Sequence, residues 1–430
     1  METSSSLTFD WAAKDRVYIW HPYTQMLSAP PAIPLERAEG VYLYTADGRR
    51  ILDGISSWWV NIHGHNHPRL NRALQEQIGK LAQVIFAGFT HEPAVRLAAE
   101  LVKCTPANLS RVFFSDDGST AVEVALKMAY QYWRNREESQ RKLFVALEHA
   151  YHGDTFGAMA VGGVKEFHCH FSDLFFEVRR VRGVESLEEI LKRESGRVVA
   201  VIVEPMVQGA GGMLIWPVEF LRQLREVTHH YSIPLIADEV FTGFGRTGKM
   251  FACEHGPIEP DLMCLSKGLT GGYLPLGATL ASEEIYGSFL SEDHTRTFFH
   301  GHSFTANALS CAVALESLAL FHEERRLERV AELEQLFRQR LNHLRDASIV
   351  RETRGIGALA VLELEPQKQA GYLDERSAVL GQAFLDRGVL LRPLGNVLYF
   401  LPPYVITDDE AHWVFDVIEE VLEGLHVSPR

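Results

Sequence analysis

The sequence predicts an α/β protein with a large domain built on a mostly parallel sheet and a second, smaller α+β domain. Three observations lead to this prediction. The chain has 430 residues, more than one hydrophobic core usually supports. Short apolar runs alternate with longer amphipathic runs, as in strands joined by crossover helices. From about residue 320 this alternation gives way to charged helical and Gly-rich strand patterns.

The central elements follow from their hydrophobic patterns. Short, largely apolar runs suit strands that are buried on both faces of a parallel sheet. Such runs occur at Arg111–Phe114, Leu143–Leu147, Val198–Val203 and Pro234–Ala237. Apolar residues at three- and four-residue spacing predict helices between these runs, at Ser119–Trp133 and Glu219–His229.

The two ends of the chain predict the smaller domain. Its expected elements are helices at Glu323–Arg345, Glu375–Arg387 and from Asp408, a strand region at Arg354–Glu363, and a hairpin of Val389–Pro393 with Val397–Leu401. An N-terminal hairpin around Val41–Tyr44 and Asp47–Gly48 should pair with this domain. We therefore expect an N-terminal segment at 1–60 packed on the small domain, a large ligand-binding domain at 61–320 and the small domain at 321–430.

Composition limits the possible partners. With 42 basic and 56 acidic residues the net charge is −14, which argues against nucleic-acid and anionic-membrane partners. No apolar run reaches the roughly 18 residues of a membrane span, and Met1–Asp10 does not resemble a secretory signal. The five cysteines are scattered without a C-x-x-C spacing. We expect a cytoplasmic protein with small-molecule substrates and no disulfide framework.

A carboxylate and a lysine follow predicted buried strands. Asp238 comes at the carboxyl end of one strand, where open α/β sheets bind ligands, although Asp is also a common helix N-cap. Lys267 follows Asp261–Leu265 and precedes Gly268. Most lysines are solvated, but burial at a strand end lowers the pKa of an amine and makes it a Schiff-base nucleophile.

An anion site and an aromatic ring are predicted at the same sheet edge. The segment Ser115–Thr120, with Gly118 and Ser119, joins a strand to a helix whose free N–H groups suit a phosphate; a simple Ser/Thr N-cap is the alternative. Tyr151 follows another predicted strand. Phosphate donors, a ring, a carboxylate and an amine are together what pyridoxal phosphate requires.

Two other patterns have weaker functional interpretations. Gly243, Gly245 and Gly248 match the dinucleotide fingerprint, but the charged, Pro-containing segment that follows is not the helix that the fingerprint needs. His63, His65 and His67 alternate, but Gly64 and Pro68 interrupt any strand between them, so we expect no metal site.

Five motifs together resemble the class III aminotransferases of pyridoxal-phosphate-dependent fold type I. They are GSTAVEVALK, YHGDTFGAM, VEPMVQGAGGM, LIADEVFTGFGRTG and LSKGLTGGYLPLGAT, and the resemblance covers nearly the whole chain. The segments IWHPYTQM (Ile19–Met26) and DGISSWWVNIHGHNHP (Asp53–Pro68) resemble the branch of this class that serves biotin biosynthesis.

The resemblance implies a cofactor site. Lys267 would attach to pyridoxal phosphate and later act as the proton-transfer base, Asp238 would pair with the pyridinium nitrogen, and Tyr151 would lie against the ring. Gly118 and Ser119 would hold the phosphate. Glu204 and Gln208 would lie near the cofactor. The segment His300, Gly301, His302 and Ser303 would reach the phosphate of a neighbouring subunit, so the resemblance implies a homodimer with shared active sites.

The resemblance also implies a substrate site and a reaction. Tyr23, Trp58 and Trp59 would form an apolar slot with Tyr151, Lys267 and Gly301, and Arg392 would bind the substrate carboxylate; Arg246 and Tyr399 are weaker candidates. The implied reaction transfers an amino group to 8-amino-7-oxononanoate, with S-adenosylmethionine as the expected donor. The alternatives are another class III aminotransferase, of the ω-amino acid or lysine-donor type, and a non-catalytic nucleotide-binding protein.

Overall fold

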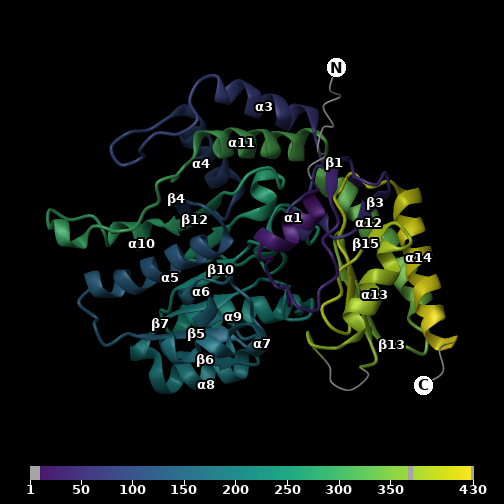
Figure 1. The fold of residues 1–430 in the computed structure, drawn as a ribbon. Helices are drawn as coiled ribbons and strands as arrows, with labels where there is room; N and C mark the ends of the chain where they lie inside the picture. The colour runs from purple at the N-terminus through teal and green to yellow at the C-terminus, as the bar shows by residue number, and fades with distance from the viewer. Residues whose placement is uncertain (1–9, 367–370, 428–430) are drawn as a thin grey trace.

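A computed structural model describes residues 10–366 and 371–427 (Figure 1). Its centre is a seven-stranded sheet with the strand order β4-β12-β11-β10-β7-β5-β6. The strands are β4 (Leu109–Ser115), β5 (Leu143–Leu147), β6 (Val178–Val181), β7 (Val198–Val203), β10 (Leu235–Asp238), β11 (Leu262–Leu265) and β12 (Gly277–Ser282). Strand β12 is antiparallel to both of its neighbours, and the pairs from β11 to β6 are parallel. The prediction of a mostly parallel sheet is confirmed.

Alternating strand residues face two helical layers, because successive side chains on a strand point to opposite faces. Val145 of β5 shares a core cluster with Leu187 of α8 (Val184–Glu194) and Leu224 of α9 (Val218–His230). Ala146, the next residue, shares another cluster with Leu126 of α5 (Gly118–Asn135). Both faces of the sheet are therefore covered, which leaves the carboxyl ends of its strands as the place for a site.

Further helices surround this core. The longer ones are α1 (Trp11–Tyr18), α3 (Pro68–Ile78), α4 (Glu92–Cys104) and α11 (Ala308–Glu323). The short elements are α2 (Ser56–Trp59), α6 (Phe156–Val161), α7 (Lys165–His168), α10 (Glu283–Gly287), β8 (Val207–Gln208), β9 (Leu214–Ile215) and the 3₁₀ turns η1 (Cys169–Leu174), η2 (Ser195–Arg197), η3 (Ala252–His255), η4 (Lys267–Thr270) and η5 (His294–Arg296). Every helix in the described ranges is too short or too polar to cross a membrane. Residues 1–9, part of the segment tested for a secretory signal, lie outside those ranges.

The C-terminal part is an α+β unit, as expected. Its antiparallel sheet contains β13 (Val350–Ile356), β14 (Leu359–Leu364) and β16 (Val397–Phe400). Its helices are α12 (Arg326–Leu344), α13 (Arg376–Leu385) and α14 (Asp408–Val427). The helix predicted from Glu323 starts instead at Arg326, because Arg325 adopts a left-handed φ of 50° that separates α11 from α12.

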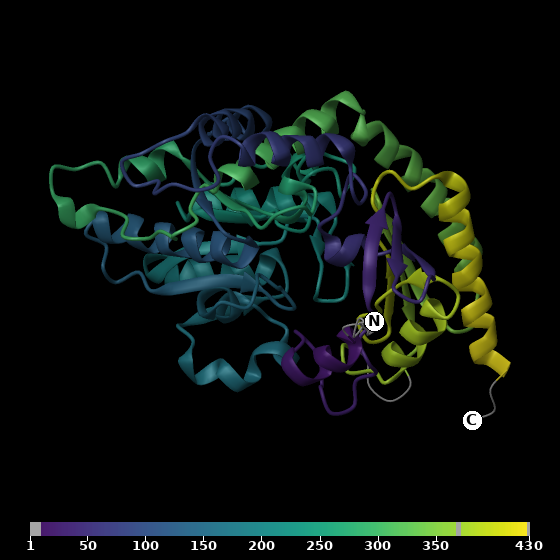
Figure 2. The ribbon, with the colours of Figure 1, turned by 45° about the horizontal axis from the view of Figure 1, so that its top comes forward.

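The N-terminal strands join this C-terminal part. Strands β1 (Leu35–Glu39), β2 (Tyr42–Thr45) and β3 (Arg50–Asp53) form a meander, and β3 pairs in parallel with β15 (Val389–Leu390). Figure 2 shows these N-terminal strands beside the C-terminal elements. The predicted hairpin of Val389–Pro393 with Val397–Leu401 is therefore wrong, because β15 and β16 belong to different sheets. The division at residues 60 and 320 stays a prediction.

Candidate active site

A cavity of about 680 Å³ opens at the carboxyl ends of the central strands. Its lining includes Asp117, Gly118, Ser119, Tyr151, His152, Glu204, Asp238, Phe241 and Lys267. A second cavity of about 310 Å³ shares Trp59, Tyr151 and Lys267 with the first and extends to Tyr23, Trp58 and Arg392. The sheet therefore brings the predicted amine, carboxylate and aromatic residues to one place.

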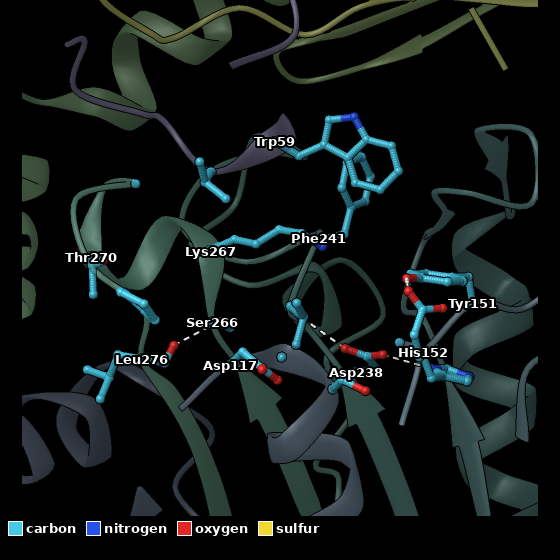
Figure 3. A pocket seen from close by; sticks show the side chains of 18 of the residues that line it. Trp59, Asp117, Tyr151, His152, Asp238, Phe241, Ser266, Lys267, Thr270 and Leu276 are labelled. Atoms are coloured by element: carbon cyan, nitrogen blue, oxygen red, sulfur yellow. Dashed lines mark hydrogen bonds and ion pairs between the residues drawn. The ribbon is translucent and has the colours of Figure 1, made fainter. Parts of the chain in front are cut away.

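Lys267 reaches into the first cavity from the turn after β11 (Figure 3). Its Nζ lies 5.2 Å from the ring centre of Trp59 and 6.0 Å from that of Phe241. Burial lowers the pKa of this amine, while the negative charges of Asp238 and Glu204 act in the opposite direction. A lowered pKa enlarges the fraction of neutral, nucleophilic amine.

Asp238 lies at the end of β10 and is held by a histidine that the sequence interpretation did not assign. His152 Nδ1 lies 2.7 Å from Asp238 Oδ2, and the amide of Val240 donates to Oδ1. The His152 side chain is fully buried, and its Nε2 has no hydrogen-bond partner among the described residues. The carboxylate is therefore held at the cavity wall by the imidazole of His152 and the amide of Val240.

The start of α5 offers free amides to an anion. Asp117 caps the helix by accepting from Thr120 N at 2.8 Å. The alternative of a Ser or Thr N-cap is therefore wrong, because Asp117 takes that position and Thr120 lies inside the first turn. Within the described ranges the amides of Gly118 and Ser119 have no hydrogen-bond partner. A Cβ at Gly118 would lie 2.5 Å from Val240 Cγ1, so close packing against the turn after β10 requires glycine.

Glu204 and Gln208 hold the loops around the cavity. Glu204 accepts hydrogen bonds from the amides of Tyr151 and Gly209 at 2.9 and 3.0 Å. Burial raises the pKa of Glu204 to about 7, despite these hydrogen bonds. Gln208 donates to the carbonyl of Glu148 and is not among the residues that line either cavity.

Trp59 forms the wall between the two cavities. Its Nε1 donates to the hydroxyl of Tyr399 at 3.0 Å, and its ring packs edge-on against Phe241. Tyr399 is 1% exposed and lines the second cavity. This fixes the ring of Trp59 beside Lys267.

The hydroxyls of Tyr23 and Tyr151 share one carboxylate, that of Asp154. Asp154 accepts hydrogen bonds from the hydroxyls of Tyr23 and Tyr151 at 2.9 and 3.0 Å. Burial raises the pKa of both tyrosines, and Asp154 adds to the effect. Phe167 packs edge-on against both Tyr23 and Tyr372. Among the residues that the structure describes, the second cavity therefore has an aromatic rim with one carboxylate, that of Asp154.

Arg392 and Trp58 also line the second cavity, and the Trp58 ring packs edge-on against Tyr23. The guanidinium carbon lies 4.4 Å from the Trp58 ring centre, a cation–π contact. Among the residues that the structure describes, no carboxylate pairs with Arg392. A guanidinium of this kind can bind a ligand carboxylate in bidentate geometry.

Other candidates do not line either cavity. Arg246 is 2% exposed and donates to the carbonyl of Pro402. His302 lies 3.5 Å from Asp116, and His300 Nδ1 lies 2.8 Å from Lys127 Nζ. Neither these histidines nor Gly301 and Ser303 line the cavities of their own chain.

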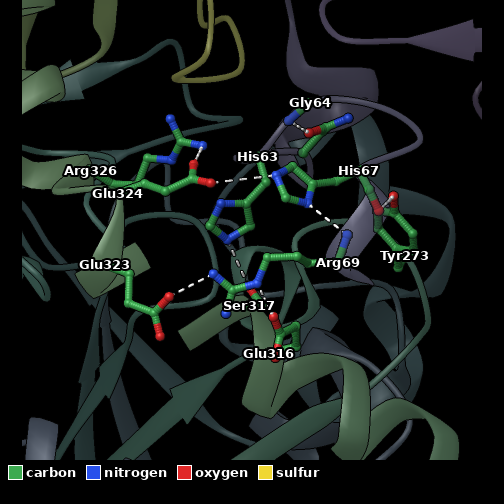
Figure 4. A network of polar contacts seen from close by, with 11 residues as sticks. His63, Gly64, His67, Arg69, Tyr273, Glu316, Ser317, Glu323, Glu324 and Arg326 are labelled. Carbon is green, nitrogen blue, oxygen red and sulfur yellow. Dashed lines mark hydrogen bonds and ion pairs between the residues drawn. The ribbon is translucent and has the colours of Figure 1, made fainter. Parts of the chain in front are cut away.

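The alternating histidines have separate partners, two of which, those of His63 and His67, are drawn in Figure 4. His63 Nε2 lies 3.1 Å from Ser317 Oγ, and burial lowers the pKa of His63 to about 3. His67 Nε2 lies 3.6 Å from Glu324, and His65 Nε2 lies 2.9 Å from Asp53 Oδ2. The described part of the chain contains no group of three or more His, Cys, Asp or Glu side chains placed to hold a metal ion.

The chain belongs to the class III aminotransferase family. The family model, described as aminotransferase class-III, matches residues 23–422. The geometry of the first cavity agrees with this assignment, because a desolvated lysine, a fixed carboxylate and free helix amides meet in it.

Comparison with individual relatives shows which members of the family the chain resembles. The chain is 46% identical to the adenosylmethionine-8-amino-7-oxononanoate aminotransferase of Synechococcus elongatus, over 95% of this chain and 99% of the relative. The crystal structure of the enzyme with that name from Methanocaldococcus jannaschii matches with a TM-score of 0.93 and 36% identity, over 96% and 98% of the two chains. An amine transaminase from an uncultivated Pseudomonas species, in a PLP-bound form, matches with a TM-score of 0.89 and 33% identity, over 94% and 98%.

Proposed function

We propose that this enzyme transfers an amino group from S-adenosylmethionine to 8-amino-7-oxononanoate, which gives the 7,8-diaminononanoate needed for biotin. The observation that carries the proposal is the second cavity, an aromatic slot lined by both Lys267 and Arg392, whose guanidinium has no carboxylate partner among the described residues. A slot of this kind fits an aliphatic chain with a reactive carbonyl near one end and a carboxylate at the other. The names of the relatives support the same reaction.

The first cavity fits pyridoxal phosphate. The amides of Gly118 and Ser119 would hold its phosphate, Asp238 its ring nitrogen and Lys267 its aldehyde carbon. When bound, the cofactor would supply an electron sink for the proton transfers and would carry the amino group between the two half-reactions. His152 Nε2, buried without a partner, gives this cavity a further polar group that a bound ligand can satisfy.

The residues of this chain have distinct tasks in the reaction. Lys267 holds and moves the proton at the reacting carbon, because burial lowers the pKa of its amine and so leaves more of the amine neutral and able to accept a proton. Trp59 and Phe241 exclude water around that amine. Tyr23, Tyr151 and Asp154 present hydroxyls and one negative charge to a cationic donor such as S-adenosylmethionine.

We also propose a homodimer with shared active sites. His300, Gly301, His302 and Ser303 lie outside the cavities of their own chain. Gly301 and Ser303 are exposed, so the backbone of this segment and the Ser303 hydroxyl are available to the phosphate of a neighbouring subunit.

The donor is tested by mixing the cofactor-loaded protein with S-adenosylmethionine and, separately, with lysine. The change in cofactor absorbance reports the first half-reaction. We expect S-adenosylmethionine alone to produce it, and Lys267→Ala to abolish it. A response to lysine alone would replace the proposed donor, and a response to neither would contradict the proposed function.

A further inference from the structure

The segment Ser56–Trp59 adopts a left-handed backbone. All four residues have positive φ angles, of 51°, 58°, 122° and 72°. None is glycine, and for such residues this conformation brings Cβ too close to the following carbonyl oxygen. A run of four persists only when its surroundings hold it.

Asp53, at the end of β3, holds one side of this segment. Its carboxylate accepts hydrogen bonds from the amide of Ser57 at 2.9 Å and from the Ser57 hydroxyl at 2.8 Å. His65 Nε2 lies 2.9 Å from the same carboxylate. The Asp53 side chain is fully buried, so it cannot exchange these partners for water. On the other side Ser56 Oγ donates to the carbonyl of Leu401 at 2.7 Å.

The left-handed turn aims two consecutive tryptophans at one substrate slot. In a strand, adjacent side chains would point to opposite faces. Here Trp58 stacks on Arg392 and Trp59 packs beside Lys267, so both line the second cavity. Asp53 itself lines neither cavity.

We infer that Asp53, supported by His65, is a positioning residue that sets the walls of the oxo-acid slot through the Ser57 turn. The inference rests on the proposed function for the identity of the substrate. Loss of the carboxylate frees the Ser57 turn, and Trp58 leaves Arg392. The apolar chain of the oxo acid then loses one wall, while the cofactor cavity keeps its own residues.

Asp53→Ala, Asp53→Asn and Ser57→Ala test this inference, with Asp47→Ala as the matched control. Asp47 lies in the exposed turn of the same sheet and contacts Thr45 and Arg49. We expect Asp53→Ala to raise the KM for the oxo acid roughly tenfold and Ser57→Ala about threefold, with the donor half-reaction and cofactor absorbance close to wild type. In Asp53→Asn the KM for the oxo acid should stay close to the wild-type value, because the side-chain amide still hydrogen-bonds to Ser57.

An unchanged KM in both Asp53→Ala and Ser57→Ala would overturn the inference. A joint loss of both half-reactions and of bound cofactor in Ser57→Ala would also overturn it, since that is the result of a merely structural role. Crystal structures of the variants give a reading that needs no substrate: Trp58 should leave Arg392 in Asp53→Ala and stay in Asp47→Ala. If the wild type does not convert the oxo acid, the proposed function fails, and the position of Trp58 still decides the inference.

Discussion

Arg392 is the residue whose removal most directly separates substrate binding from cofactor binding. Its guanidinium stacks on Trp58 and lines only the second of the two cavities. We expect Arg392→Ala to raise the KM for the oxo acid about 100-fold, because a charge-assisted, bidentate contact is lost. Cofactor absorbance should not change. Arg387→Ala, which removes a surface pair with Glu420, is the control. An unchanged KM in Arg392→Ala would remove this residue from the carboxylate site.

The buried carboxyl of Glu204 should make the free energy of unfolding depend on pH. Burial raises its pKa from 4.5 to about 7, so the folded state binds this proton more tightly than the unfolded state. The stability from this group is present below the unfolded pKa and is lost as pH rises towards the folded pKa. Between these values the free energy of unfolding of the cofactor-free wild type should fall, relative to Glu204→Gln, by about 3 kcal/mol. Urea denaturation across this pH range measures the difference. Parallel curves for the two proteins would contradict the assigned shift.

At the residue scale, strand ends were enough to predict Lys267 and Asp238 as neighbours, because parallel strands bring their carboxyl ends to one edge. The family resemblance supplied Tyr23 and Arg392. His152 and Asp53 could not be predicted as supports. Their roles depend on contacts with residues that lie beside them only after folding, such as the contact between His152 and Asp238.

At the element scale, the cap of α5 can be tested by its effect on stability. Asp117 satisfies the amide of Thr120, and Thr120 Oγ1 accepts from the amide of Asp117 in return. Asp117→Ala should cost about 1 kcal/mol of stability and lower Tm by about 1–2 °C. Thermal unfolding measures this, with the exposed Asp173→Ala as control. Equal Tm values for the two variants would contradict the importance of the cap.

The elements show where local patterns are sufficient. The strand Val198–Val203 and the helix from Asp408 were predicted at their observed starts, because continuous apolar runs and helical periodicity are local signals. The pairing of β15 with β3 was not predicted as such, since a strand of two residues takes its partner from tertiary packing. The break at Arg325 was also missed, because no Gly or Pro marks it.

At the scale of the whole molecule, mixed dimers test the shared active site. Lys267→Ala disables its own site, and the double variant His302→Ala/Ser303→Ala disables the segment proposed to serve the partner. A mixed dimer then contains one complete site. Equal mixing should recover about a quarter of wild-type activity from two nearly inactive variants, provided that subunits exchange. No recovery after verified exchange would show that the segment serves its own chain.

The measurement that tests the proposed function most directly is product formation by the purified protein. The protein is loaded with pyridoxal phosphate and incubated with S-adenosylmethionine and 8-amino-7-oxononanoate, and the products are identified by mass spectrometry. We predict 7,8-diaminononanoate in amounts that increase with time and depend on Lys267. Consumption of the amino donor with other oxo acids, but no diaminononanoate from this one, would contradict the proposal and assign the chain to another class III activity.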